Sequence, residues 1–111
     1  MPSAVLIPVV GGLRRVTFGT LEEMQALVGG YVEVLRVAHP SGALLFCNED
    51  GKRLRLRPNP RASLVAALPA GQYIVGDAFV SGSANSHGDE TDVPADVAAW
   101  LFRLWPGGAE R

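Results

Sequence analysis

A segment that must change from helix to strand across two glycines places the strongest constraint on the fold of this chain. Thr20 and Glu23 have the spacing of a capping box. In this motif the threonine hydroxyl accepts a hydrogen bond from the Glu23 amide, and the glutamate carboxylate reaches back toward the backbone of the N-cap. Apolar residues then recur at helical spacing at Leu21, Met24, Leu27 and Val28. Gly29-Gly30 supplies a left-handed stop. The helix is therefore about two turns long and needs tertiary packing to hold it.

Apolar and alternating runs predict the remaining elements. Strands are expected over 5–10, 15–18, 31–38, 44–47, 53–57 and 73–80. A second helix should begin with Asn59 as N-cap and Pro60 at its first position, with Leu64, Val65 and Leu68 buried. A third should begin near Pro94, capped by Asp92 or Thr91, with one apolar face that comprises Val97, Trp100, Leu101, Leu104 and Trp105.

This order of elements predicts an α+β fold, because hairpin-connected strands alternate with short helices. We expect a mostly antiparallel mixed sheet of about five or six strands with two or three short helices, and the opening order is compatible with a β-grasp-like core. The 111 residues should form a single domain, 1–111, with a core over about 4–105 and a frayed tail over 106–111.

Composition narrows the class of protein. Hydrophobic residues make up 48% and charged residues 19% of the chain, as in ordinary soluble domains. The net charge of −1 argues against binding nucleic acid or an anionic membrane by bulk electrostatics. Cys47 is the only cysteine, so neither an internal disulfide nor a cysteine-based zinc site is expected. The apolar run 4–10 is too short for a membrane span and does not resemble a signal peptide, so the expected location is the cytoplasm.

The turn 48–52 is the strongest candidate for a ligand or partner site. Asn48 can cap this turn and Gly51 suits a left-handed position, so turn chemistry explains both residues. Turn chemistry does not explain Glu49 and Lys52, whose side chains can bind polar groups. Asp50 belongs to the same turn, and Asn59 and Asp77 are expected nearby in a compact sheet. The alternative is a hairpin tip whose charged side chains are simply solvated.

A row of basic residues forms the second candidate. Arg53, Arg55 and Arg57 would project from one face of a strand at intervals of roughly 6 to 7 Å, close to the spacing of successive phosphates. Lys52 and Arg61 would extend this patch. The alternative is an edge strand that its charges protect from aggregation. Together the two candidates give the expected ligand- or partner-binding residues Asn48, Glu49, Lys52, Arg53, Arg55, Arg57 and Asn59.

The sequence gives little support for catalysis, nucleotide binding or metal binding. The sequence has no Walker loop, dinucleotide fingerprint or nucleophile elbow. The polar loop 81–92 contains His87, but its spacing does not match a calcium loop, and solvation is the better interpretation. His39 is most simply a turn residue and Cys47 a small core residue. No catalytic residue, metal or cofactor is therefore expected.

Three pieces of sequence together resemble a known family. They are Leu21-Glu22-x-x-Gln25-x-Leu27-Val28-Gly29-Gly30-Tyr31-x-Glu33, then Asn48-Glu49-x-Gly51-Lys52, then Asn59 with Val75-Gly76. This pattern resembles the domain of unknown function 3846, found in bacteria, phages and plasmids, over about residues 5–104. The resemblance implies a small intracellular domain related to mobile elements, and it transfers no activity and no catalytic residue.

Three functions are compatible with these features. The leading hypothesis is a binding or regulatory module that acts through protein–protein contact, as a monomer or a homodimer away from the membrane. The first alternative is a protein that binds nucleic acid or a phosphate ligand through the basic strip from Lys52 to Arg61. The second is an uncharacterised enzyme that uses Glu49, Asp77 or Cys47.

Overall fold

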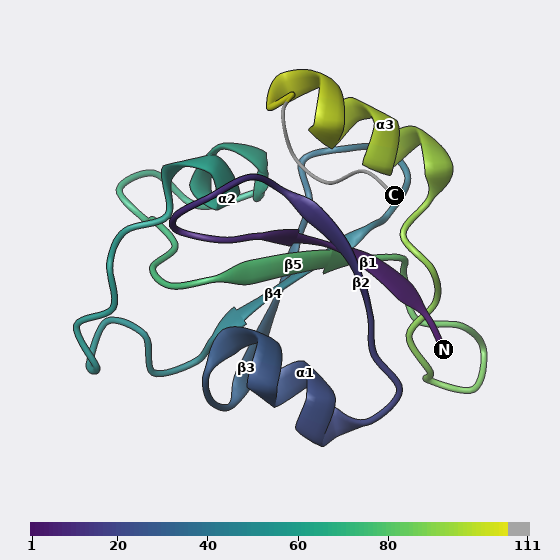
Figure 1. The fold of residues 1–111 in the computed structure, drawn as a ribbon, viewed down its shortest axis with the longest axis horizontal. Coiled ribbons are helices and arrows are strands. Elements are labelled where there is room, and N and C mark those ends of the chain that lie inside the picture. Colours follow the sequence, from purple (N-terminus) through teal and green to yellow (C-terminus); the bar gives the residue numbers. More distant parts are fainter. Residues whose placement is uncertain (107–111) are drawn as a thin grey trace.

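The computed structural model describes residues 1–106, which form five strands and three helices (Figure 1). In chain order they are β1 (Ser3–Ile7), β2 (Arg14–Thr17), α1 (Leu21–Val28), β3 (Val32–Arg36), β4 (Leu44–Asn48), α2 (Pro60–Val65), β5 (Ala78–Ser81) and α3 (Ala95–Leu104). Of the tail expected over 106–111, all but Pro106 lies outside the described residues.

The five strands form one open sheet in the order β2-β1-β5-β4-β3, and every neighbouring pair is antiparallel. This arrangement confirms the α+β class predicted from the sequence. Within residues 1–106 the sheet lacks the parallel pairing of a mixed sheet or a β-grasp-like core, because β1 and β5 run in opposite directions. The two edge strands are β2 and β3, and β1 and β5, the first and last of the described strands, pair with each other inside the sheet.

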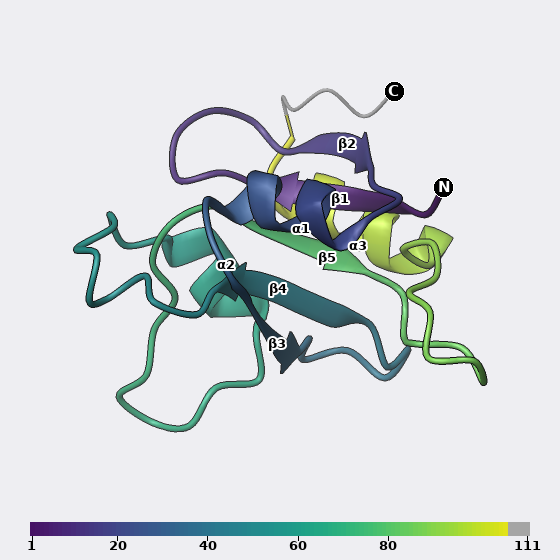
Figure 2. The same cartoon turned by 90° about the horizontal axis from the view of Figure 1, so that it is seen from below.

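Both faces of the sheet carry a core. Helix α1 covers one face, and α2 and α3 cover the other (Figures 1 and 2). On the α1 face, Met24 and Val28 pack with a group of aromatic side chains that includes Phe46 and Phe79, whose rings stack 4.8 Å apart. On the opposite face, the alternate residues of the same strands, such as Leu45 and Val80, pack against α2 and α3. The domain is therefore a three-layer structure with the sheet in the middle.

The ends of α1 follow the predicted pattern. The Thr20 hydroxyl accepts from the Glu23 amide at 3.1 Å, and the Glu23 carboxylate accepts from the Gly19 amide at 2.9 Å. Gly29 ends the helix with φ of +79°, in the left-handed region that glycine adopts without strain. Leu21 was expected on the buried stripe but is 53% exposed. It lies at the first position of the helix, and the core contacts begin at Met24.

Helix α2 begins as expected but presents a different face. The Asn59 side chain caps it by accepting from the Ala62 amide at 3.1 Å, and Pro60 occupies the first turn. Ala62 and Val65 are buried, whereas Leu64 is 75% exposed. The expectation that Leu64 is buried was wrong because consecutive helical residues point about 100° apart, and a helix this short buries one narrow face.

Several strand boundaries differ from the sequence prediction: β1 ends at Ile7 and not at residue 10, and two later segments depart further. The apolar run 73–80 forms a strand only from Ala78, because Gly76 has φ of +80° and interrupts the extended backbone. Asp77 then turns its carboxylate back to accept from the Val9 amide at 2.8 Å. No strand forms over residues 53–57: turns occupy residues 51–55, and residues 56 and 57 are irregular. Here the Leu54 amide donates to the Asp50 carbonyl and the Leu56 amide to the Gly51 carbonyl.

Helix α3 is buried through Val97, Ala98, Leu101 and Phe102. Trp100 and Trp105 pack partly against the same core, whereas Leu104 is 47% exposed, contrary to expectation. The expected caps were also wrong: Asp92 accepts from the Ser3 amide, Thr91 donates to the Ser83 carbonyl, and Pro94 precedes the helix with no side-chain cap. No helix within residues 1–106 has the length and apolar character needed to cross a membrane.

Candidate functional site

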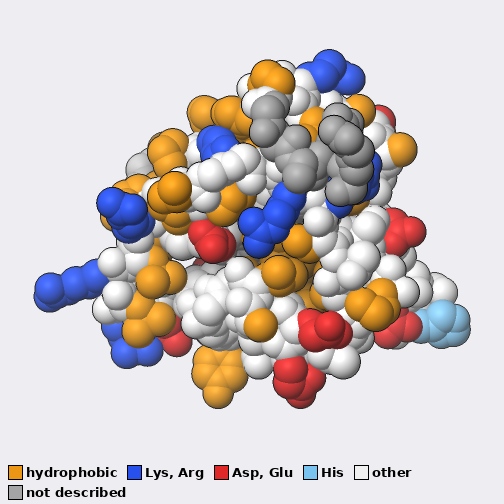
Figure 3. Space-filling view, viewed as in Figure 1, with side chains coloured by type: hydrophobic (Ala, Val, Ile, Leu, Met, Phe, Trp, Pro, Cys, Tyr) orange, Lys and Arg blue, Asp and Glu red, His pale blue; other side chains and the backbone are white. Residues whose placement is uncertain are grey.

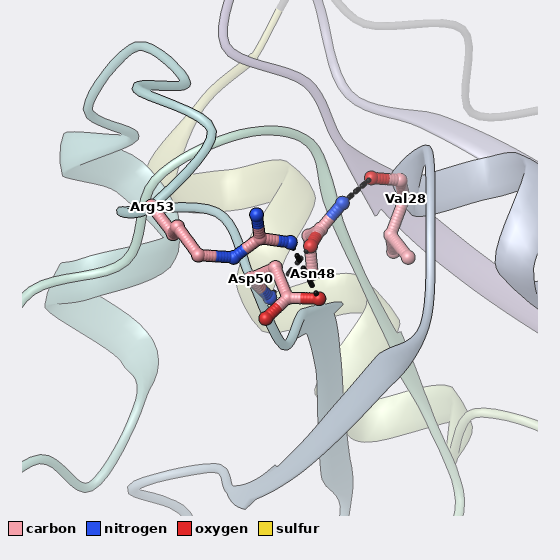
Figure 4. A network of polar contacts seen from close by, with 4 residues as sticks. All are labelled: Val28, Asn48, Asp50 and Arg53. Carbon is pink, nitrogen blue, oxygen red and sulfur yellow. Dashed lines mark hydrogen bonds and ion pairs between the residues drawn. The ribbon is translucent and has the colours of Figure 1, made fainter.

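Asn48 is the structural centre of the candidate turn. Its side-chain oxygen accepts from the Asp50 amide at 2.8 Å, which forms the expected turn after β4. Its side-chain nitrogen donates to the carbonyl of Val28 at 3.1 Å, at the end of α1 (Figure 4). Asn48 is buried, so its bond to Val28 is shielded from water and its bond to Asp50 is partly shielded. This side chain therefore joins the end of β4 to the end of α1, and both of its hydrogen-bonding groups are used within the fold.

Gly51 has a role that differs from the expected one. It does not adopt a positive φ, so the left-handed position predicted for it is absent. A Cβ atom at Gly51 would lie 2.6 Å from Cγ2 of Val75 and 3.3 Å from its carbonyl oxygen. Glycine is needed here because the turn after β4 passes against the segment that leads into β5. This contact brings the turn 48–52 beside residues from much later in the chain.

A cleft of about 420 Å³ opens where these segments meet. One wall is formed by Glu33 and Leu35 on β3 and by Cys47 on β4. A second wall is formed by the turn, from Asn48 to Arg53. The third is formed by the loop after α2, through Leu68, Pro69, Gln72, Tyr73, Ile74 and Val75. The cleft thus has an apolar interior and charged groups around its mouth.

The charged groups of the cleft differ in how they are paired. Arg53 forms an ion pair with Asp50 at 3.4 Å, in which the arginine side chain is largely exposed (Figure 4). Lys52 places its ammonium nitrogen 4.4 Å from the centre of the Tyr73 ring and 3.4 Å from the Gln72 amide oxygen. Neither Glu33 nor Glu49 has an ion-pair partner among the described residues. The cleft therefore offers two unpaired carboxylates to a ligand.

Cys47 lies in the wall of the cleft but is poorly suited to be a nucleophile. Burial and the nearby Glu33 carboxylate raise the pKa of its thiol from 9.0 to about 11, against a smaller opposing effect of Lys52. A thiol with such a pKa is almost entirely protonated at neutral pH, and the thiolate is the reactive form. The side chain packs as a small apolar residue, in agreement with the sequence interpretation.

The arginine row does not form as predicted. Arg53 and Arg55 lie in the turns after β4, and Arg57 lies in the irregular segment that follows. Arg55 has φ of +59°, so no continuous extended backbone sets a regular spacing for the three side chains. Lys and Arg side chains project outward at the left of Figure 3, over this connecting segment. Only Lys52 and Arg53 of the basic strip border the cleft, while Arg57 borders a separate hollow beside Gly29. The strand expectation failed because alternation alone does not supply a pairing strand.

Asn59 and Arg61 serve the structure. Asn59 is fully buried, and its amide donates to the carbonyls of Ile7 and Gly76, both at 2.9 Å, besides capping α2. Its hydrogen-bonding groups are thus used internally, and we remove it from the candidate site. Arg61 donates to the carbonyls of Pro8 and Gly11 and holds the β1–β2 connection.

Sequence reasoning missed one wall of the cleft. Gln72 and Tyr73 belong to the loop 68–75, which had been assigned in part to a strand. Glu33 had been noted only as part of the family pattern. Its position on an edge strand, beside Cys47 in the β3–β4 register, is what brings it to the cleft. No group of three or more His, Cys, Asp and Glu side chains in residues 1–106 is arranged to hold a metal ion.

Comparison with known proteins gives one match. Neither the curated proteins nor the solved structures contain a match to this chain. The model of the family described as domain of unknown function, DUF3846, matches residues 3–105, nearly the whole chain and all the elements of the sheet. The match includes the helix stop at Gly29-Gly30, the turn at Asn48 and the cleft that this turn borders. The chain therefore belongs to the DUF3846 family.

Proposed function

We propose that this protein is a small binding module that recognises a partner protein through the cleft between β3, the turn 48–53 and the loop 68–75. The observation that carries this proposal is the composition of the cleft. Apolar side chains line its interior, while Glu33 and Glu49 stand at its mouth without ion-pair partners among the described residues. Specific binding sites combine such an apolar interior with a few placed polar groups.

Three features favour binding over the alternatives. The arginines lack the extended backbone that would match successive phosphates, so the nucleic-acid alternative loses its geometric support. The raised pKa of Cys47 makes the one thiol of the cleft a weak nucleophile. The exposed tyrosine ring of Tyr73 beside Lys52 is also a typical contributor to protein interfaces, where aromatic residues are enriched.

Three further observations support a biological setting for the proposal. A cytoplasmic location is supported by the single buried thiol of Cys47 and the lack of a membrane-crossing helix in residues 1–106. Membership of the DUF3846 family supports a role connected with phages or other mobile elements, as the resemblance implied. The partner is then expected among the proteins of the host cell or of the element itself.

A pull-down with paired variants tests the proposed function. The protein is immobilised and exposed to a lysate of its native host, and captured proteins are identified by mass spectrometry. Replacing Glu49 and Lys52 together by alanine should remove the specific partner, because both side chains are exposed at the cleft. The matched control replaces Glu22 and Arg103, two exposed charges that do not border this cleft, and should retain the partner.

Both double variants should keep the thermal midpoint within a few degrees, because changes to exposed charges usually alter stability by no more than about 0.5 kcal/mol. Loss of the partner only in the cleft variant supports the proposal. Equal capture by both variants would refute it and would point to another surface.

A further inference from the structure

The outer edge of β3 is paired with another segment at one end of the strand and is unpaired along the rest. On its inner side, β3 pairs with β4 along its whole length, from Val32 opposite Asn48 to Arg36 opposite Leu44. The Glu49 amide donates to the Tyr31 carbonyl and the Val37 amide to the Ala43 carbonyl. Because antiparallel bonding alternates along a strand, the odd-numbered residues face β4, and Val32 and Val34 turn their N–H and C=O groups outward.

The segment after α2 begins to pair with this edge as a sixth strand would, but the pairing does not continue. Val37 forms an isolated antiparallel bridge with Ala66, where the Ala67 amide donates to the Arg36 carbonyl at 2.8 Å and the Ala38 amide to the Val65 carbonyl at 2.7 Å. Continuing this register would place residue 69 opposite Val34. That residue is Pro69, which has no N–H to donate to the Val34 carbonyl. The pairing therefore ends, and the outward groups of Val32 and Val34 remain without a strand among the described residues.

Hollows lie on both faces of the sheet beside this free stretch. The cleft described above borders Glu33 and Leu35 on one face. On the other face a hollow of about 430 Å³ borders Val32 and Val34, with Phe46 and Met24 in its walls. A strand added to an exposed edge gains affinity from main-chain hydrogen bonds and specificity from pockets that receive alternate side chains. The free edge of β3 has both properties.

We infer that β3 is a docking edge for an extended segment of a partner protein in which basic and apolar residues alternate. The inference rests on the proposed function and deepens it by naming the partner chemistry. An antiparallel segment that pairs with Val32 and Val34 places its middle residue opposite Glu33, about 4.5 Å away between Cα atoms. A lysine or arginine there meets the unpaired Glu33 carboxylate, with Glu49 at the same cleft, while its neighbours enter the apolar hollow.

Charge disfavours a second copy of this chain as the occupant. Two β3 strands paired through Val32 and Val34 about a two-fold axis would place Glu33 opposite Glu33 of the other copy. Like charges directly opposite are destabilising. Shifting the register to pair Val34 with itself would require the groups of Arg36, whose carbonyl already accepts from Ala67.

Synthetic peptides provide the test. A capped seven-residue peptide of alternating valine and lysine is titrated into the isotope-labelled full chain, and amide chemical shifts report the site. We expect the amides of Val32 and Val34 to respond. A peptide of alternating valine and glutamate should bind at least about tenfold more weakly because of charge repulsion. A peptide with the lysines and valines grouped in blocks controls for net charge and should also bind more weakly.

Variants of β3 separate edge pairing from general attraction. Val34→Pro removes an outward-facing N–H without removing a β3–β4 bond, so the fold should survive while peptide affinity falls by about tenfold or more. Val34→Thr keeps the N–H and is the matched control. Glu33→Lys should reverse the preference toward the valine–glutamate peptide. Val34→Pro could still distort β3, so a second measurement leaves the protein unchanged. A valine–lysine peptide N-methylated on its backbone lacks the N–H donors for edge pairing and should lose a similar amount of affinity for the native chain.

Failure of the valine–lysine peptide to bind overturns the inference, as does binding that Val34→Pro and N-methylation leave unchanged. A wild-type dimer that Val34→Pro dissociates also overturns it, in favour of a second copy. If the double alanine variant of Glu49 and Lys52 loses its captured partner while the peptide does not bind β3, the proposed function stands without edge docking. If the peptide binds β3 but the cleft variant retains every partner, the proposed function fails.

Discussion

Asn48 shows how much one buried amide contributes to this molecule. Its oxygen fixes the turn through the Asp50 amide, and its nitrogen holds the end of α1 through the Val28 carbonyl. Gly30 accommodates it closely, since a Cβ atom there would lie 2.8 Å from the Asn48 side-chain nitrogen. An acceptor and a donor are both required at this position, and asparagine supplies both in one side chain.

Replacing Asn48 by aspartate should therefore destabilise the protein. The carboxylate keeps the acceptor for the Asp50 amide but faces the Val28 carbonyl without a donor. We expect a loss of about 1–3 kcal/mol in the free energy of unfolding, measured by urea denaturation at neutral pH. Asp50→Asn, at an exposed ion pair, is the control and should change stability far less. Equal effects of the two changes would contradict this role of Asn48.

Cys47 gives the protein a pH dependence at alkaline pH. Its thiol pKa is raised by burial and by Glu33 to about 11 from 9.0. In that window the unfolded chain releases a proton that the folded chain keeps, so the free energy of unfolding should fall as pH rises. The contribution is fully present below the unfolded pKa. Cys47→Ala should flatten the decline between these two pH values, and identical slopes for both proteins would contradict the assignment.

At the scale of elements, helices are defined by their ends and oriented by their neighbours. The caps of α1 and α2 were predictable because Thr20, Gly29 and Asn59 act on backbone groups within one turn. The face that each short helix buries was not predictable in the same way: Leu64 and Leu104 were expected to be buried, and both are exposed. The regular alternation over 53–57 predicted a strand, but strand formation depends on a partner far away in sequence. Here the pairing is limited to the end of the segment, where the Gly76 amide donates to the Arg57 carbonyl and Pro58 forms an isolated bridge with Val75.

Helix α3 allows this orientation to be tested within one element. Leu101 is fully buried against the sheet, whereas Leu104 is half exposed. Leu101→Ala should cost about 2–5 kcal/mol, because it removes packed methyl groups and leaves a cavity. Leu104→Ala, one turn later, should cost less than about 1 kcal/mol. Denaturant titration of both variants gives the comparison, and similar losses would show that the helix is rotated from the arrangement described.

At the scale of the whole molecule, one sheet serves two cores. Neighbouring residues of β4 and β5 point to opposite faces, so Phe46 and Phe79 pack under α1 while Leu45 and Val80 pack under α2 and α3. The candidate cleft was only half predictable for a related reason. The turn 48–52 could be recognised locally, but the loop 68–75 reaches it through long-range contacts such as Gly51 against Val75.

The shared sheet should make unfolding cooperative across both faces. Met24→Ala, on the α1 face, should destabilise by about 2–5 kcal/mol. Native-state hydrogen exchange should then show the slowest amides of α3 losing the same free energy as those of α1, because both report global unfolding. Phe102→Ala supplies the reciprocal experiment from the other face. Unchanged protection of α3 in the Met24 variant would mean that the two layers open independently.

The central position of β1 has a consequence for synthesis on the ribosome. Among the strands of residues 1–106, β1 is made before its inner neighbour β5, which emerges about seventy residues later. At translation rates of about 5–20 residues per second, the apolar inner edge of β1 waits several seconds for its partner. A nascent chain arrested before Ala78 should therefore remain protease-sensitive, and it would be a natural client for chaperones that bind extended apolar segments.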